Sequence, residues 1–264
     1  MSKKVNVDEL TTKVKQMYRD VAENPHAAYH FELGRPLAVR LGYDTDVLDQ
    51  IPAEAIESFA GVGYFFDLAD ISRGETVVDL GSGSGMDALY AAQLNEPFGR
   101  VIGVDFTIEQ LTKARRLTSD IGLARIEFRE GHIERLPVTD ESVDCVISNG
   151  VINLSPDKER VFAEVARVLR PGGRLAVADI VTDQSLTDAI VCSADLWASC
   201  IGGAAKQDEY RRAIETAGLR IIEIRHNPYE FISDQARNAS GTFGVKSVSV
   251  LAVKLSRESV AGPS

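Results

Sequence analysis

The chain has 264 residues, and 44% of them are hydrophobic, which suffices for one large domain or for one domain with a cap. Acidic residues outnumber basic ones by 39 to 29, and the net charge of −10 argues against nucleic acid or an anionic membrane as a partner. Three cysteines without a paired spacing exclude a disulfide framework. No run approaches the ~20 apolar residues of a membrane helix, and no apolar segment follows the first basic residues, so we predict a cytoplasmic protein.

The first part of the chain carries helical spacing without strand alternation. Val14, Met17, Tyr18 and Val21 fall on one helical face. Open parallel sheets bind ligands outside the carboxyl ends of their strands, so a helical segment placed there would close over the pocket. We therefore expect a helical cap over residues 1–70, a ligand-binding domain over residues 71–254 and a flexible tail over residues 255–264.

From about Thr76 onward, short β-branched runs alternate with helical patterns, which is typical of a parallel sheet built from βαβ units. The connection between the last two strands, about twenty residues, is short for a crossover helix and favours an antiparallel pair. The predicted fold class is α/β, with a doubly wound, mostly parallel sheet of seven strands. The expected strands are residues 76–80, 100–104, 126–129, 143–147, 174–179, 220–224 and 245–253, with late helices at 186–201 and 208–217.

Two earlier helices have recognisable ends. Thr107 is placed to cap the helix after the second strand, with Gln110 closing a capping box and Gly122 ending the helix. Ser155 precedes a proline and is placed to cap the helix after the fourth strand, and the run Pro171-Gly172-Gly173 is expected to stop that helix.

A glycine loop follows the first strand. In Asp79-Leu80-Gly81-Ser82-Gly83-Ser84-Gly85, glycines at every second position let a ligand lie against the backbone. A dinucleotide fingerprint would need a glycine where Met86 stands, which disfavours a nicotinamide cofactor. Asp105 lies at the end of the second strand, where its carboxylate would accept hydrogen bonds from two ribose hydroxyls. The sequence therefore implies a nucleoside ligand.

The glycine loop together with Asp105 resembles the S-adenosylmethionine site of the class I methyltransferases. The resemblance implies S-adenosyl-L-methionine as the cofactor and places the loop after the third strand beside the adenine. Ile133 and Glu134 would flank the base, whereas His132 is either an adenine contact or a partly exposed loop histidine. The cofactor-binding residues implied by the resemblance are Asp79, Gly81, Ser82, Gly83, Gly85, Asp105, Phe106, His132, Ile133, Glu134 and Asn149.

Three segments, residues 74–83, 148–158 and 197–204, are similar to the arsenite methyltransferases. That family holds As(III) with three thiolates, soft ligands for a soft acceptor. Here Val62 and Gly150 stand where two of the three cysteines belong, and only Cys200 matches. Cys192 precedes Cys200 by eight residues, about 12 Å along a helix, which is too far to share one atom. Cys145 falls within the fourth strand, as a small buried hydrophobic residue would.

The resemblance implies an S-adenosylmethionine-dependent methyltransferase that kept the cofactor site and changed its acceptor to carbon, oxygen, nitrogen or sulfur of a small molecule. Two alternatives stay open: an arsenite methyltransferase with an altered thiol site, and a non-catalytic cofactor-binding module. No metal ligand set stands out, and the sequence leaves the acceptor and the oligomeric state open. Candidate catalytic residues are Tyr18, His30, Asn149 and Cys200, although Tyr18 also fits a core position, His30 a structural histidine and Asn149 an Asx turn.

Overall fold

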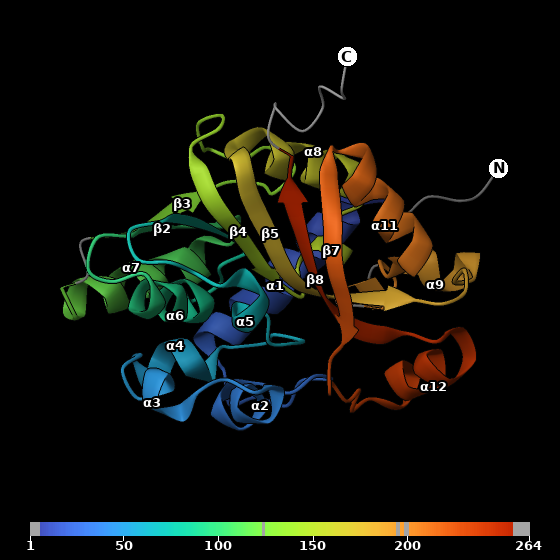
Figure 1. Ribbon diagram of the computed structural model, residues 1–264. Coiled ribbons are helices and arrows are strands. Elements are labelled where there is room, and N and C mark those ends of the chain that lie inside the picture. Colours follow the sequence, from blue (N-terminus) through green and yellow to red (C-terminus); the bar gives the residue numbers. More distant parts are fainter. Residues whose placement is uncertain (1–5, 123–124, 194–195, 198–200, 256–264) are drawn as a thin grey trace, which may run out of the picture.

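A mixed sheet forms the centre of the computed structural model, which describes residues 6–122, 125–193, 196–197 and 201–255 (Figure 1). Seven strands lie in the order β3-β2-β1-β4-β5-β8-β7, and the two-residue β6 pairs with β5 outside this path. β8 runs antiparallel to both neighbours, and the other pairs are parallel. The doubly wound fold and the antiparallel final pair are thus confirmed. The strands are β1 (Thr76–Leu80), β2 (Arg100–Asp105), β3 (Ile126–Glu130), β4 (Val143–Asn149), β5 (Leu169–Thr182), β6 (Ala205–Lys206), β7 (Leu219–His226) and β8 (Lys246–Lys254).

Helices cover both faces of this sheet because its central strands are apolar on both sides. In β1, Val77 belongs to one buried cluster, together with residues of α6 (Met86–Leu94) and α7 (Ile108–Asp120). The next residue, Val78, belongs to the cluster of the opposite face, with α8 (Lys158–Val168) and α11 (Gln207–Thr216). The alternation of side chains along a strand therefore gives the protein two cores.

Between residues 6 and 70 the described chain forms five helices joined by loops and contains no strand. Helix α1 (Val7–Glu23) buries Leu10, Val14 and Val21, whereas Met17 and Tyr18 are only partly buried. Figure 1 shows α2 to α4 at the lower end of the sheet, where the parallel strands terminate. None of the described helices combines the length and apolar character needed to span a bilayer. The remaining helices of this part are α2 (Gly34–Leu41), α3 (Thr45–Leu48), α4 (Ala53–Glu57) and α5 (Phe66–Ala69).

Both predicted capping arrangements are wrong in detail. Thr107 precedes α7, but its side chain caps no backbone group, and Gln110 bonds to other elements instead. The cap of α8 is Asp157, whose carboxylate accepts from the backbone N–H of Arg160 at 3.0 Å. Helix α8 ends at Val168, before the Pro-Gly-Gly run, and β5 passes through that run.

The second half of the chain contains one helix that the sequence analysis missed. The connection from β7 to β8 includes α12 (Asp234–Phe243), in which only Ala236 and Ala239 are buried, so the apolar pattern is weak. Of the helix expected over residues 186–201, the structure describes α9 (Asp188–Val191), while 194–195 and 198–200 lie outside the described residues. The short helix η1 (Ile152–Leu154) follows β4. The predicted tail, apart from Leu255, also lies outside the described residues.

Candidate cofactor site

The glycine loop between β1 and α6 lies directly over the end of β2. The backbone N–H groups of Gly81 and Ser82 both donate to the carbonyl of Val104, at 2.7 and 3.1 Å. Gly81 has a φ of +67°, and a Cβ built on it would lie 2.5 Å from the side chain of Val151, so only glycine fits. The backbone of the loop is therefore exposed to whatever lies above it.

A cavity opens above this loop, with about 720 Å³ of empty space including its mouth. Its walls are the glycine loop, residues 58–61, Asn149 at the end of β4, and Val14 and Tyr18 of α1. A second hollow adjoins it and shares Val14, Gly81 and Asp105 with it. The second hollow is lined by the β3 loop, through Gly131, His132, Ile133 and Glu134.

Asp105 lies where the two hollows meet and ties the loop to the sheet. Its carboxylate accepts from the backbone N–H of Gly83 at 3.0 Å and from that of Thr107 at 2.8 Å. Burial raises the pKa of Asp105, and these two N–H groups oppose the increase by stabilising the charged form.

Nearly all predicted cofactor residues line this continuous groove. Gly85 does not: it has a φ of +92° at the start of α6, and a Cβ there would lie 2.7 Å from Phe128, so its role is in the fold. The residues that do line the groove are Asp79, Gly81, Ser82, Gly83, Asp105, Phe106, His132, Ile133, Glu134 and Asn149.

The four catalytic candidates are not brought together. Tyr18 and Asn149 line the first cavity, and His30 lines neither hollow. Cys200 lies outside the described residues. Asn149 is engaged by its surroundings: its Oδ1 accepts from the backbone N–H of Val62 at 2.7 Å, and its Nδ2 donates to the carbonyl of Gly63 at 3.0 Å.

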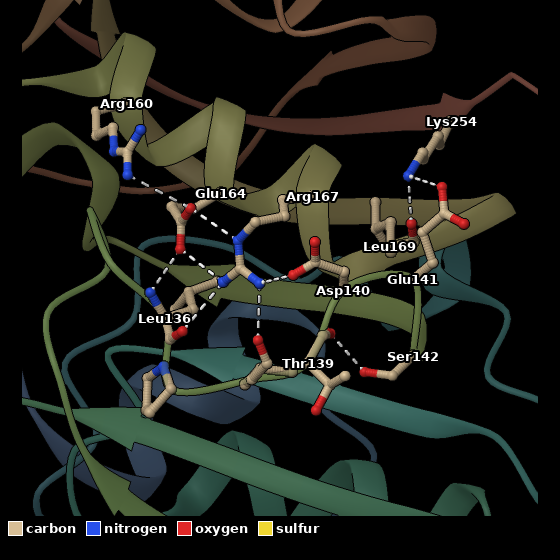
Figure 2. A network of polar contacts seen from close by, with 12 residues as sticks. Leu136, Thr139, Asp140, Glu141, Ser142, Arg160, Glu164, Arg167, Leu169 and Lys254 are labelled. Carbon is tan, nitrogen blue, oxygen red and sulfur yellow. Dashed lines mark hydrogen bonds and ion pairs between the residues drawn. The ribbon is translucent and has the colours of Figure 1, made fainter.

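Helix α8 fixes the segment that forms the wall of the second hollow. Figure 2 shows Glu164 and Arg167 of α8 reaching the loop between β3 and β4. Glu164 accepts from the backbone N–H of Leu136 at 2.8 Å, and Arg167 donates to the carbonyls of Leu136 and Val138 at 3.1 and 2.9 Å. Because this anchor begins two residues after Glu134, it fixes that side of the groove.

Three buried carboxyl groups gather under the first cavity: Asp79, Asp87 and Asp105, which are 2%, 7% and 8% exposed. Asp87 accepts from the hydroxyl of Tyr43 at 2.6 Å and from Asn149 Nδ2 at 3.1 Å. Asp79 Oδ2 has no hydrogen-bond partner among the described residues. The sequence analysis missed Asp87, Tyr43 and Gln110; the available signal was the acidic Asp87 within the otherwise apolar start of α6.

The charge of the groove fits a cationic ligand. Its ionisable lining groups include the carboxyls of Asp79, Asp87, Asp105 and Glu134, and no Lys or Arg of the described chain lines it. S-adenosylmethionine carries a sulfonium and an ammonium. The unpartnered oxygen of Asp79 and the exposed glycine backbone therefore fit this cofactor.

The segment Gly61–Tyr64 continues from the cavity wall, to which Gly61 belongs, and is fixed by strand residues. Ser247 and Ser249 of β8 donate to the carbonyls of Val62 and Tyr64, at 2.7 and 3.0 Å. A Cβ built on Gly150 would lie 3.2 Å from Val62 Cγ1. The two positions that lack the expected cysteines are thus neighbours.

Neither of the two thiols within the described residues lines the groove. Cys145 is fully buried in β4, and burial raises its pKa to about 12. Cys192 ends α9 and does not line the groove. No group of three or more His, Cys, Asp or Glu side chains in the described part of the chain is arranged to hold a metal ion.

The sequence matches known methyltransferases. A family model described as "Methyltransferase domain" matches residues 71–218. The arsenite methyltransferase of Halobacterium salinarum is 44% identical over 197 residues, which are 74% of this chain and 50% of the relative. Methyltransferase GfsG of Streptomyces halstedii is 33% identical over 74% of this chain and 69% of the relative. The chain spans about half the length of the arsenite methyltransferases it matches.

Solved structures agree with this similarity. CrArsM, an arsenic(III) S-adenosylmethionine methyltransferase from Chlamydomonas reinhardtii, has a TM-score of 0.67 at 33% identity, covering 80% of this chain and 72% of that one. A geranyl diphosphate C-methyltransferase from Streptomyces coelicolor, solved with S-adenosyl-L-homocysteine, has a TM-score of 0.68 over 93% of this chain and 98% of that one. At 18% identity, the second likeness concerns the fold alone.

Proposed function

Because this chain belongs to the methyltransferase domain family, we propose that it is an S-adenosylmethionine-dependent methyltransferase acting on a small-molecule acceptor. The observation that carries the proposal is the continuous groove, which joins the glycine loop, Asp105 and the β3 loop. In this proposal Asp105 binds the ribose, the wall from His132 to Glu134 encloses the adenine, and Asp79 with the loop backbone holds the methionine end. In the same proposal, residues 1–70 form a cap over the groove. The protein is located in the cytoplasm.

The chain's own residues contribute mainly by positioning. The cofactor supplies a methyl group on a sulfonium, which makes transfer an in-line displacement. The glycine loop and Asp105 would fix the donor, while Tyr18 and residues 58–61 would limit the approach of the acceptor. A general base is required only if the acceptor carries a proton of high pKa.

The acceptor site favours carbon, oxygen, nitrogen or sulfur over arsenite. Val62 and Gly150 are in contact distance of each other, as two ligands of one arsenic atom would be, yet neither can donate an electron pair from a thiolate. The similarity to arsenite methyltransferases supports the alternative, in which thiols from elsewhere complete an altered site. A non-catalytic cofactor-binding module is the other alternative, and turnover would distinguish it.

Calorimetry with S-adenosylhomocysteine tests the cofactor assignment. Asp105→Ala removes charge-assisted hydrogen bonds worth about 1.5–3 kcal/mol each, so affinity should fall at least about tenfold. Asp144→Asn is the control, because Asp144 is buried at the far end of the sheet, where it accepts from the backbone N–H of Thr76. Equal affinity of the wild type and Asp105→Ala would contradict the assignment.

We also expect little or no methylated arsenic from purified protein given arsenite, a reducing thiol and S-adenosylmethionine. One flexible thiolate cannot fix the direction of the acceptor relative to the sulfonium. Chromatography with arsenic-specific detection measures the products. Robust methylation that is lost in Cys200→Ser would establish the altered-site alternative, with Cys192 as the first residue to test next.

A further inference from the structure

We propose that Asp79 and Asp87 share one proton in the free protein and release it when the ammonium end of the cofactor enters the groove. The pair would thereby select ligands by charge. This inference rests on the proposed function, and it assigns a role to Asp87, which the family resemblance did not single out.

Two buried carboxyl groups line one cavity. Asp79 lies in β1 and Asp87 in the first turn of α6, and both line the first cavity. They are 2% and 7% exposed. No Lys, Arg or His of the described chain lines this cavity. Two like charges this deeply buried are costly to maintain together, so a shared proton stabilises the free state.

The hydrogen bonds distinguish the two carboxyls. Asp87 accepts from Tyr43 and Asn149, and both bonds favour its charged form. Asp79 Oδ2 receives no hydrogen bond from the described residues. The proton therefore resides mainly on Asp79, and its oxygen is the one left available to an incoming cation.

The electrostatics agree with this arrangement. Burial raises the pKa of Asp79 well above its usual range, and the charges of Asp87 and then Asp105 raise it further, whereas a hydrogen bond from the backbone N–H of Ala88 opposes the increase. Burial raises the pKa of Asp87 to about 6, with the bonds from Tyr43 and Asn149 opposing the increase. The groups that face the pair are Asp105 from β2, Tyr43 from the loop before α3 and the neutral Asn149 from β4. An ammonium ion beside Asp79 favours the charged form of its carboxyl group, so the proton is released to the buffer.

Calorimetric titration with S-adenosylhomocysteine in buffers of different ionisation enthalpy counts the protons released. We expect a net release of up to one proton at pH 7, and hence an affinity that rises with pH by up to about tenfold per pH unit. 5′-Methylthioadenosine lacks the amino-acid end, so its binding should release none. Binding of S-adenosylhomocysteine without proton release would overturn this inference and leave the proposed function in place. No binding at all would remove both.

Three substitutions should each change proton release or the pH dependence of affinity in a different way. Asp79→Asn should abolish proton release. Asp87→Asn should move the rise in affinity to lower pH, because the repulsion on Asp79 is gone, whereas Tyr43→Phe should move it to higher pH, because Asp87 loses a donor. The two conservative variants keep the test informative if Asp79→Asn binds too weakly to measure. The control Asp144→Asn should match the wild type. If Asp87→Asn and Tyr43→Phe both moved the rise in affinity in the same pH direction, the shared proton would be contradicted.

Discussion

Gly83 forms part of the groove wall, and its backbone has a φ of +52°. A Cβ at this position meets nothing closer than Gln110 Oε1, at 3.7 Å, so alanine strains the backbone without a clash in the protein itself. We expect Gly83→Ala to reduce stability by about 1 kcal/mol. Its affinity for S-adenosylhomocysteine should fall at least about tenfold, because the new methyl group occupies the ligand side of the loop.

Gly172 provides a matched control for this substitution. Its φ is +81°, a Cβ there has nothing within 4 Å, and it lies outside the groove. Gly172→Ala should lose similar stability and no affinity. Urea unfolding and calorimetry on both variants separate the two effects, and an equal loss of affinity in both would mean that backbone strain alone accounts for the Gly83 result.

Asp87 marks the limit of what residue patterns reveal at this scale. The glycine loop and Asp105 were predictable, because a ligand against the backbone and a strand-end carboxylate leave a local signature. The role of Asp87 depends on Tyr43, forty-four residues away in sequence, and on Asn149, sixty-two residues away. Neither contact can be predicted from local sequence spacing, so the pairing of Asp79 with Asp87 is recognised only in the folded structure.

Among the elements, α1 is the one most directly coupled to the groove. Leu10, Val14 and Tyr18 line its two hollows. Its carboxyl-terminal half is held by α7: Gln110 donates to the carbonyl of Tyr18 at 2.7 Å, and Lys113 to that of Ala22 at 3.2 Å. Bound cofactor would add contacts along the same face.

We therefore expect amide exchange in residues 7–23 to slow when S-adenosylhomocysteine is added. Peptides from α11, which does not line the groove, serve as the internal reference. Hydrogen exchange followed by mass spectrometry measures both. Identical protection of α1 with and without ligand would show that this helix does not act as a cap.

The anchor between α8 and the β3–β4 loop predicts a pH-dependent stability. The bond from Arg167 holds the pKa of Glu164 below its usual range. The stability that ionised Glu164 contributes is therefore fully present above about pH 4.3, the pKa of glutamate in the unfolded chain, and is lost as the pH falls. Glu164→Gln should reduce the free energy of unfolding by about 1–3 kcal/mol at pH 7. The difference from the wild type should shrink below about pH 4. Urea denaturation at both pH values measures it, and a pH-independent difference would assign the loss to packing.

At this scale the strands were far more predictable than the helix caps. The expected bounds of β1 agree with the structure, because β-branched residues flanked by glycine and polar residues leave little choice. Thr107 and Ser155 looked like caps, but Gln110 forms a tertiary contact with Ser84, and Asp157 is better placed to cap α8. Gln110 satisfies the local capping rule but hydrogen-bonds to distant residues instead.

For the whole molecule, the sequence predicted the sheet and brought out the glycine loop and the β3 loop that line the groove, but not how the opposite wall is held. The segment Gly61–Tyr64, which begins in the cavity wall, is held by Ser247 and Ser249, each 185 residues away from the carbonyl it contacts. Such contacts arise from the antiparallel insertion of β8 beside β5. The resemblance located Val62 and Gly150 as the altered positions, and their proximity required the assembled sheet.

The place of β8 also has a consequence for biosynthesis. It is the last of the described strands to be translated, yet it pairs with β5 from Arg174 to Val181 in the middle of the sheet. While it remains in the ribosome, the nascent chain exposes the apolar edge of β5, which favours aggregation. In stalled ribosome complexes, chains that have emerged only up to residue 245 should be cut by protease within β5. Chains that have emerged beyond residue 254 should resist cleavage there. The edge of β5 thus stays open to aggregation until β8 has left the ribosome and paired with it.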